Sequence, residues 1–321
     1  MFNNGSSPTV TNCTFSGNTA IFGGGMNNGF DSNPTVTDCT FSGNSAGNRG
    51  GGMYNENSDP NITDCIFSEN ASEGGGSGMF NHSSNPTVTE CVFSENLTMF
   101  GSGAGMFNTF CDSFQVTNCL FIGNMATCQA GGIYNTKGST PTVMNSAFVG
   151  NTANCEGGGI LNVASNMILI NCTLTGNSAL NDGGGMWNTS FATVINCIVW
   201  GNSPNEISGP ANVSYGNVQG GWPGIGNIDA DPLFVDPDNG DFRLSTDSPC
   251  IDAADNTAVP EGVLRDLDGN PRFVDSTFVG TMATVDMGAY EYQRSVGGLA
   301  NGPWLRDVLT LLGWSALPGL D

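Results

Sequence analysis

A cassette of about 26 residues repeats roughly eight times between Met1 and Asn202, and this repeat constrains the fold more than any other feature of the chain. Aligned cassettes give two columns of asparagine whose successive members lie 25–28 residues apart. The first column follows a Met or Ile by two places and comprises Asn3, Asn28, Asn55, Asn81, Asn108, Asn135, Asn162 and Asn188. The second comprises Asn18, Asn44, Asn70, Asn96, Asn124, Asn151, Asn177 and Asn202. A fixed period of this length is typical of a solenoid, in which each unit buries its apolar face by stacking on the next.

The interior of one cassette indicates short β-strands. In residues 34–46, Val36, Cys39 and Phe41 alternate with polar residues, apart from Asp38, where we expect the chain to bend. No cassette carries a helical stripe of ten or more residues, which excludes leucine-rich, ankyrin and tetratricopeptide repeats, and propeller blades need longer units. The sequence therefore predicts an all-β fold: a right-handed parallel β-helix, built as a three-sided solenoid of about eight regular coils followed by irregular C-terminal coils.

The repetition of asparagine has a physical explanation. Equivalent side chains in stacked coils lie about 4.8 Å apart, so each amide can donate to the amide on one side and accept from the amide on the other. This arrangement satisfies polar groups whose burial would otherwise cost stability. Asparagine also tolerates the left-handed backbone conformation of a sharp corner, and we expect it at such corners. Both columns are therefore predicted to be structural, with no ligand needed to explain them.

Three apolar columns are predicted to fill the interior, one for each side of the coil. The first comprises Phe15, Phe41, Phe67, Phe93, Phe121, Phe148, Leu174 and Val199. The second comprises Met26, Met53, Met79, Met106, Ile133, Ile160 and Met186. The third comprises Val10, Val36, Ile62, Val88, Val116, Val143, Leu169 and Val194.

Cysteine follows the same period. Seven of the eleven cysteines share one column, which Ser146 interrupts: Cys13, Cys39, Cys65, Cys91, Cys119, Cys172 and Cys197. Vertical neighbours lie within disulfide range, but parallel side-chain vectors would strain the bond, so we expect small buried hydrophobes. Cys128 and Cys155 differ because both lie in the variable loop, 27 residues apart, and they are the candidate disulfide. The only histidine, His82, lies in a polar loop, and no Cys/His spacing supports zinc.

Composition limits the partners. Seven basic against 29 acidic residues give a net charge of −22, which disfavours nucleic acid and anionic membranes. Few charged residues and many Gly, Asn, Ser and Thr suit a secreted or cell-surface rod, which we expect to be monomeric. We find no candidate membrane span in the sequence. We also expect no signal peptide, because Met1-Phe2-Asn3 already matches the strand end Met79-Phe80-Asn81. We therefore expect the natural chain to extend upstream, where a secretion signal would lie.

After Asn202 the repeat loosens, and three regions are predicted: a β-helix over residues 1–228, an acidic capping module over 229–293, and a tail over 294–321. Of the 29 acidic residues, 17 follow residue 200. Residues 213–218 and 241–244 read as strands of further irregular coils, and the module is expected to close the solenoid. In the tail, Trp304, Leu305, Val308, Leu311 and Leu312 have helical spacing over a length too short to span a bilayer.

One acidic cluster in the module is a candidate Ca²⁺ site. Five aspartates fall within thirteen residues: Asp229, Asp231, Asp236, Asp238 and Asp241. Oxygen-rich loops of this kind suit Ca²⁺, although the spacing is not that of an EF-hand. Asp-Pro and Asn-Gly are also ordinary turn formers. We therefore predict that the protein needs no cofactor, and Ca²⁺ is the single candidate for a bound metal ion.

Two resemblances rest on these motifs. The cassettes resemble the repeats of chlamydial polymorphic outer-membrane proteins, marked by Gly-Gly-[Ala/Ile] and Phe-x-x-Asn, as in Gly131-Gly132-Ile133 and the Phe41/Asn44 pair; Met replaces Ala or Ile in most cassettes, which is a departure. Residues 231–245, with the segments 248–253, 266–272 and 285–292, resemble the terminal module of large bacterial β-helix surface proteins of the choice-of-anchor Q type. Both resemblances imply a secreted or surface-displayed β-helix, and neither implies a defined activity.

Three functions are compatible with the sequence. The first is a structural or adhesive surface rod whose faces bind glycans or neighbouring cells. The second is a polysaccharide lyase or glycoside hydrolase of pectate-lyase-like fold. Lyases of this fold need a basic proton acceptor, but only Arg49 and Lys137 are basic in the first 200 residues. Hydrolases need a carboxylate cluster, and Asp38, Asp64 and Glu90 share one column. The same column holds Asn12, Asn118, Asn145, Asn171 and Asn196, so a corner role and a non-enzymatic protein are predicted.

The third function is an ice-binding face built from threonine. Ranks of Thr-Val-Thr are formed by Thr9/Thr11, Thr35/Thr37 and Thr87/Thr89, with Thr63 and Thr117 extending one row. Asn61, Gln115 and Met144 interrupt these ranks, and outward Thr is also the ordinary choice for a solvated strand.

Overall fold

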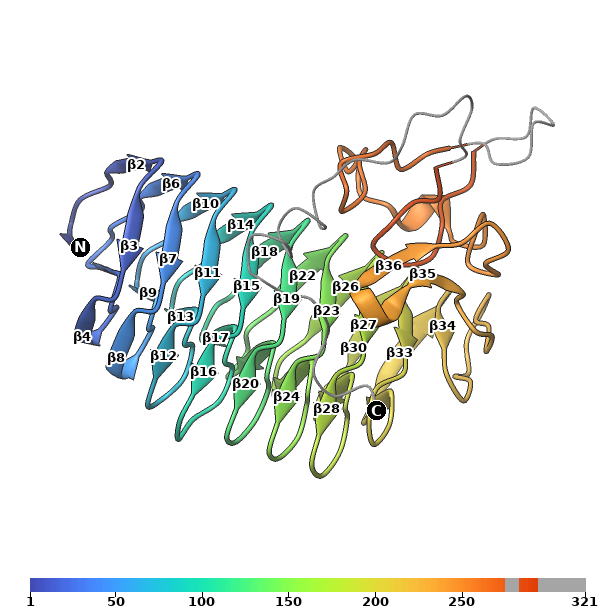
Figure 1. Ribbon diagram of the computed structural model, residues 1–321, viewed down its shortest axis with the longest axis horizontal. Helices are drawn as coiled ribbons and strands as arrows, with labels where there is room; N and C mark the ends of the chain where they lie inside the picture. The colour runs from blue at the N-terminus through green and yellow to red at the C-terminus, as the bar shows by residue number, and fades with distance from the viewer. Residues whose placement is uncertain (275–282, 294–321) are drawn as a thin grey trace.

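Short parallel strands wind into a solenoid in the computed structural model, which describes residues 1–274 and 283–293 (Figure 1). Each coil contributes one strand to each of three long sheets, which we name A, B and C in the order in which the chain visits them. Most coils then add a short strand to a fourth sheet, D. The coils are numbered 1 to 9 after their strand in sheet A.

Within the described residues, sheets A, B and C have nine strands each and sheet D has seven, all of them parallel. Sheet A comprises β1 (Phe2–Asn4), β5 (Met26–Gly29), β9 (Met53–Glu56), β13 (Met79–His82), β17 (Met106–Thr109), β21 (Ile133–Thr136), β25 (Ile160–Val163), β29 (Met186–Asn188) and β32 (Ile207–Ser208). Sheet B comprises β2 (Thr9–Thr11), β6 (Thr35–Thr37), β10 (Asn61–Thr63), β14 (Thr87–Thr89), β18 (Phe114–Thr117), β22 (Pro141–Met144), β26 (Met167–Ile170), β30 (Ala192–Ile195) and β33 (Ala211–Ser214).

The other two sheets follow the same order. Sheet C comprises β3 (Thr14–Ser16), β7 (Thr40–Ser42), β11 (Ile66–Ser68), β15 (Val92–Ser94), β19 (Leu120–Ile122), β23 (Ala147–Val149), β27 (Thr173–Thr175), β31 (Ile198–Trp200) and β34 (Asn217–Val218). Sheet D comprises β4 (Thr19–Phe22), β8 (Ser45–Arg49), β12 (Ala71–Ser72), β16 (Leu97–Thr98), β20 (Met125–Ala126), β24 (Thr152–Ala153) and β28 (Ser178–Ala179). The predicted all-β parallel solenoid is confirmed, and sheet D is an addition that the sequence analysis did not anticipate.

The asparagine columns form continuous amide ladders. In the column within sheet A, each Nδ2 from Asn3 to Asn162 donates to the Oδ1 of the next coil over 2.7–2.9 Å. The column after sheet C is bonded more fully. For example, Asn124 Nδ2 donates to Asn151 Oδ1 (2.9 Å) and to the carbonyl of Phe93 (2.8 Å), while its Oδ1 accepts from Asn96 Nδ2 (2.8 Å). Apart from Asn18 at the N-terminal end, which is exposed, these bonds satisfy side chains that have almost no contact with solvent.

The corners correct one expectation about asparagine. No member of either ladder has a positive φ; the left-handed residue at the C–D corner is the one before the ladder, such as Gly43 (φ 60°) or Glu69 (φ 54°). The left-handed residues at the B–C corner form the Asp/Asn column instead, and Asp38 has φ 52°. The chain therefore places flexible or short polar residues at its sharp bends and leaves the ladder amides in extended backbone, where their side chains can stack.

The interior is filled as the apolar columns predicted. The phenylalanine rings from Phe15 to Phe148 stack with centroids 4.7–4.8 Å apart and planes within 5° of parallel. The Val and Met columns and most of the cysteine column join them in one buried cluster. Such regular stacking makes each coil depend on its neighbours.

The C-terminal module corrects the expected cap, because it lies beside the solenoid rather than closing its end (Figure 1). Phe242, Leu267 and Tyr290 pack against the outward side chains of sheet C, including Leu120 and Val149. The module contains the antiparallel pair β35 (Phe234–Asp236) and β36 (Asp241–Leu244), so residues 241–244 form a hairpin strand and not a further coil. It also contains two 3₁₀ turns, η1 (Pro237–Asn239) and η2 (Asn256–Ala258).

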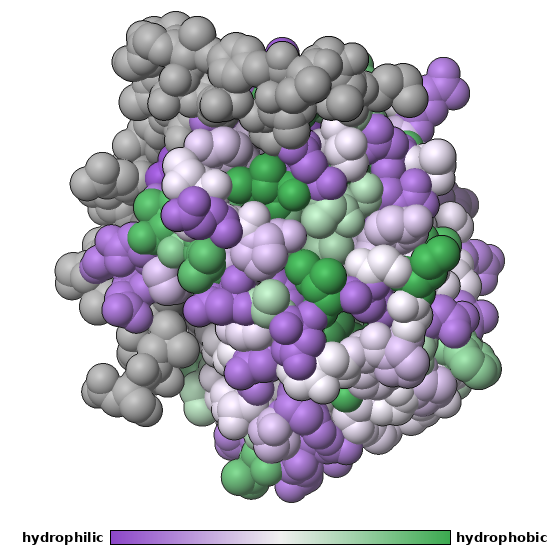
Figure 2. Space-filling model, turned by 90° about the vertical axis from the view of Figure 1, so that its right-hand side faces the viewer, coloured by the Kyte–Doolittle hydropathy of each residue, from purple (hydrophilic) through white to green (hydrophobic). Residues whose placement is uncertain are grey.

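The end of the ninth coil is covered by the loop that follows β34. Trp222 packs against the main core, and its Nε1 donates to the carbonyl of Ala211 over 3.4 Å. Figure 2 shows this end of the molecule, where hydrophilic and neutral residues surround small separate hydrophobic patches. The predicted tail helix, from Trp304 to Leu312, lies outside the described residues. No helix in the described part of the chain is long and apolar enough to cross a membrane.

Candidate functional site

The structure does not bring the five predicted Ca²⁺ ligands together. Four of these carboxylates instead accept hydrogen bonds from nearby residues. Asp229 accepts from Gly220 N–H (3.0 Å), and Asp231 accepts from Leu233 N–H (2.9 Å). Asp236 accepts from Asn239 Nδ2 (2.9 Å), and Asp241 accepts from Arg243 Nη2 (2.6 Å). Asp238 lies in η1. Among the described residues, no three His, Cys, Asp or Glu side chains are grouped so as to hold a metal ion. Turn formation therefore explains this cluster.

The two loop cysteines do lie together. Cys128 and Cys155 occupy successive loops between sheet D and sheet A, and their Sγ atoms are 3.8 Å apart as free thiols. Both are partly exposed, unlike most of the cysteine column. Burial and the neighbouring Cys128 raise the pKa of Cys155. The pair is therefore placed for a disulfide that the structure does not contain.

The acidic column stands at the exposed B–C corner of coils 2 to 4. Asp38, Asp64 and Glu90 adopt left-handed backbone, with φ of 52°, 52° and 54°, and all three are exposed. Partial burial raises the pKa of Asp64, and the charges of Glu90 and Asp38 add to this. The geometry is that of a corner that carries like charges. No basic side chain is paired with these acids in the salt bridges of the described residues.

An aromatic column runs along the outer side of sheet A, and the sequence analysis missed it. Its members occupy the position between Met or Ile and the ladder asparagine: Tyr54, Phe80, Phe107, Tyr134 and Trp187. Neighbouring rings lie 4.7–5.4 Å apart. Phe80 is fully buried and Arg49 covers its ring at 4.8 Å. The glycine-rich loops pack closely on this column, since a Cβ added at Gly75 would lie 3.0 Å from Phe107. This column is therefore mainly a small second core.

The turns between sheets A and B present aromatic rings to solvent. Phe30, Phe110 and Phe191 lie in these turns and are 70%, 47% and 64% exposed. Phe30 and Phe110 both have φ of 56°, in a left-handed column otherwise held by small, polar or charged residues such as Asn57 and Ser83. A bulky side chain rarely adopts this backbone, and such strain is concentrated at functional sites. We name this edge of the solenoid, with its three exposed phenylalanines, the A–B edge.

Phe110 has charged and aromatic neighbours on adjacent coils. The Nζ of Lys137, the only lysine of the chain, lies 4.9 Å from the Phe110 ring centroid. The only histidine, His82, contacts the ring edge-on at 5.6 Å. The sequence places His82 in a polar loop but does not predict that it lies near Lys137. Their meeting depends on the stacking register, which pairs His82 with Thr109 and Thr109 with Thr136.

Polar side chains complete the A–B edge. The Oδ1 atoms of Asn33, Asp59 and Asn85 each accept a backbone N–H from the neighbouring coil, over 2.5–3.0 Å. Asn33 and Asp59 are exposed. These bonds fix the turns and leave the other oxygen or the amide nitrogen facing solvent. The edge therefore combines apolar ring faces with hydrogen-bonding groups on a rigid support.

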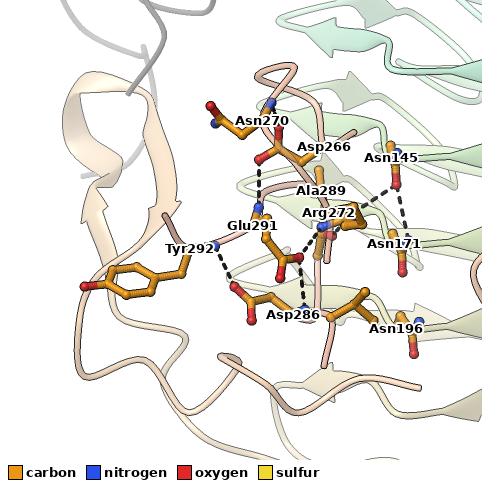
Figure 3. A network of polar contacts seen from close by, with 12 residues as sticks. Asn145, Asn171, Asn196, Asp266, Asn270, Arg272, Asp286, Ala289, Glu291 and Tyr292 are labelled. Carbon is orange, nitrogen blue, oxygen red and sulfur yellow. Dashed lines mark hydrogen bonds and ion pairs between the residues drawn. The ribbon is translucent and has the colours of Figure 1, made fainter. Parts of the chain in front are cut away.

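A buried ionic network fastens the module to the solenoid (Figure 3). The fully buried Arg272 pairs with Glu291 over 3.3 Å and donates to Asn145 Oδ1 over 3.0 Å. Asp266 and Asp286 accept backbone N–H groups of Glu291 (2.9 Å) and Tyr292 (2.6 Å). Burial raises the pKa of Asp286 to about 7 and that of Glu291 to about 9.

This network explains the split in the B–C corner column. Asn145 also donates to the carbonyl of Arg265 (2.6 Å), and Asn196 exchanges two hydrogen bonds with the backbone of Asp255 (2.8 and 3.0 Å). A carboxylate at these two positions would lack the amide donor. At coils 6 and 8 asparagine therefore lies where the module docks, whereas the exposed corners of coils 1 to 4 carry Asn12, Asp38, Asp64 and Glu90.

Comparison with known proteins addresses the fold. A family model described as right handed beta helix region matches residues 1–153. This chain is a right-handed parallel β-helix repeat protein. The structure extends the same winding beyond the matched residues, through the ninth coil. Neither a curated protein nor a solved structure shows significant similarity to this β-helix.

Proposed function

We propose that this β-helix is a non-catalytic rod of the cell exterior that binds glycans along its side. The observation that carries the proposal is the A–B edge, where exposed phenylalanines and hydrogen-bonding side chains are held on a stiff, laddered support. Sugars offer both apolar C–H faces and hydroxyl groups, and sites that combine aromatic rings with a few polar groups suit such ligands. The scarcity of charged residues and the surface-protein resemblance of the module support an exterior location.

An adhesive role is favoured over catalysis for a chemical reason. The carboxylates that share a column on adjacent coils are exposed corner residues: Asp38, Asp64 and Glu90 at the B–C corner, and Glu69 and Glu95 at the C–D corner. Asparagine or glycine takes their place in other coils. A hydrolase needs one carboxyl group protected as an acid and another ionised beside it. The buried carboxyls of the Arg272 network are enclosed between module and solenoid, where no polymer chain reaches them.

The test is a glycan array probed with the purified protein, together with an assay for new reducing ends and unsaturated products. We expect retention on one or more glycans without any product. Cleavage of a bound polysaccharide would overturn the non-catalytic part of the proposal. If the protein binds no glycan on the array, the glycan-binding part of the proposal is overturned.

A further inference from the structure

The three exposed phenylalanines of the A–B edge are evenly spaced along the solenoid. Phe30 follows β5 in coil 2, Phe110 follows β17 in coil 5, and Phe191 follows β29 in coil 8. The order of sheet A places β17 three strands beyond β5 and β29 three strands beyond β17. Since neighbouring strands lie about 4.8 Å apart, the rings repeat about every 14 Å along the rod.

We propose that the A–B edge binds one extended chain of a neutral polysaccharide, which lies along the rod axis and stacks on Phe30, Phe110 and Phe191. This inference rests on the proposed function and names the ligand class and its orientation. A ligand that matches equally spaced rings must itself repeat in one direction, and a linear polymer does so. A compact ligand would contact one ring at most, because about 14 Å separates each ring from the next.

The charge of the protein selects a neutral polymer. The net charge of −22 repels a polyanion. Asp31 and Asp112 lie in the turns of Phe30 and Phe110, and Asp59 lies in the A–B turn of coil 3 between them. Lys137 and His82 flank Phe110 but are the only basic residues at this edge. Carboxylate and amide oxygens accept hydrogen bonds from sugar hydroxyls, while the ring faces take the C–H side of the sugar.

Three weak contacts on one rigid body produce avidity. Once a chain stacks on one ring, the next ring is presented to the same chain at a high effective concentration. Binding therefore increases with chain length, and loss of one ring has a smaller effect than loss of all three. We expect each single Phe→Ala substitution to raise Kd by about threefold to tenfold, and the triple variant to raise it by about a hundredfold.

The test is affinity electrophoresis and titration calorimetry with mixed-linkage β-glucan, galactomannan, arabinoxylan and polygalacturonate. The variants are Phe30→Ala, Phe110→Ala, Phe191→Ala and their combination, with Phe110→Tyr as the variant that keeps a ring. Phe100→Ala is the matched control, because Phe100 is 79% exposed but lies in the loop between sheets D and A. The melting temperature of each variant checks that the exposed substitutions leave the fold intact.

The outcomes separate this inference from the proposed function. Binding of a neutral polysaccharide that the triple variant loses, and that Phe100→Ala and Phe110→Tyr retain, supports the inference. If the wild type binds a glycan and the triple variant binds it equally well, the inference is overturned and the proposed function stands. Binding of polygalacturonate alone overturns the choice of a neutral ligand. A wild type that binds none of these polysaccharides but binds another glycan on the array overturns the inference alone, and one that binds no glycan at all overturns both.

Discussion

At the scale of the residue, this protein shows how position within a coil decides what asparagine does. Inside the two ladders, between their end members, the amide is buried and bonded on both sides, so its role is to satisfy polar groups of neighbouring coils. At the B–C corner the same residue type adopts left-handed backbone and faces outward or toward the module, as in Asn145 (φ 46°). The sequence predicts the positions of the ladder columns and of the B–C corner column equally well. Only the backbone conformation and the hydrogen bonds show that asparagine has a different role in each.

The ladder predicts a large effect for Asn124→Leu. This substitution leaves the carbonyl of Phe93 and the amides of Asn96 without their partner, and each buried orphan costs about 1–3 kcal/mol. Thr117→Ala is the control, because the side chain is partly solvated and such changes stay within about 0.5 kcal/mol. Urea unfolding of both variants gives the comparison, and equal midpoints would contradict the inward orientation of the ladder.

The acidic corner predicts a gain on neutralisation. Replacing Asp38, Asp64 and Glu90 together with asparagine keeps a residue type that occupies this left-handed corner in other coils, and it removes stacked like charges worth up to about 1 kcal/mol. Because the folded state raises the pKa of Asp64, its ionised form destabilises the fold at neutral pH and the protonated form does not. The variant should therefore melt higher than the wild type at pH 7, and the difference should vanish below the ordinary Asp pKa of 3.8. A loss of stability at pH 7 would contradict this account.

At the scale of the element, the strands and their interior residues follow from the repeat, whereas the module and the edge do not. The columns of Phe, Val and Met are periodic, so position in the cassette predicts burial directly. The A–B edge escaped prediction because Phe30, Phe110 and Phe191 sit in turns of differing length, and no single column contains all three. The docking of Arg272 on Asn145 joins residues 127 positions apart that belong to no shared repeat.

The loops between sheets D and A predict a selective oxidation. Cys128 and Cys155 should form a disulfide under mild oxidation, which non-reducing peptide mapping would detect, and closing a loop of this length stabilises the fold by about 3 kcal/mol. In the reduced, native protein, iodoacetamide should modify Cys13, Cys128 and Cys155, because the remaining cysteines are buried. Rapid native labelling of Cys91 would show that the cysteine column is more accessible than the structure indicates.

The module joint predicts an unusual pH dependence. Asp286 and Glu291, with pKa values of about 7 and about 9, hold protons when the module is docked that they release when it detaches. The contribution of these two groups to docking is therefore full below their ordinary pKa values of 3.8 and 4.5, and it is lost as pH rises through about 7 and about 9. Limited proteolysis of residues 229–293 should be faster at pH 9 than at pH 5.5, and a rate that falls with pH would contradict the assignment.

A substitution tests the same joint at constant pH. Arg272→Ala removes the buried donors to Asn145 Oδ1 (3.0 Å) and to the carbonyl of Gly288 (2.7 Å). Each buried acceptor left unpaired costs about 1–3 kcal/mol, so the module should become sensitive to protease while coils 1 to 4 stay protected. Arg265→Ala is the matched control, because the Arg265 side chain is exposed and bonds only to a local carbonyl, that of Gly269, over 2.5 Å. Equal sensitivity of the two variants would show that the buried contacts of Arg272 do not hold the module.

At the scale of the whole molecule, two continuous amide ladders and a stacked aromatic core make a straight support, and the module stiffens one side of it. Sheet C under the module is thereby unavailable over coils 4 to 8. The A–B edge lies on a different corner, and in the described part of the chain its three phenylalanines are exposed. In the proposed function, the number of coils between the three phenylalanines fixes the distance between the contacts that bind the polysaccharide.

The measurement that tests this account most directly is titration calorimetry with a length-defined series of a neutral oligosaccharide, followed by analysis of the recovered sugar. The account predicts weak binding by chains too short to reach two phenylalanines, about 14 Å apart, and a steep rise in affinity once a chain spans them. It also predicts that the sugar is recovered at its original length. Affinity that does not depend on chain length, or recovery of shortened chains, would contradict the account.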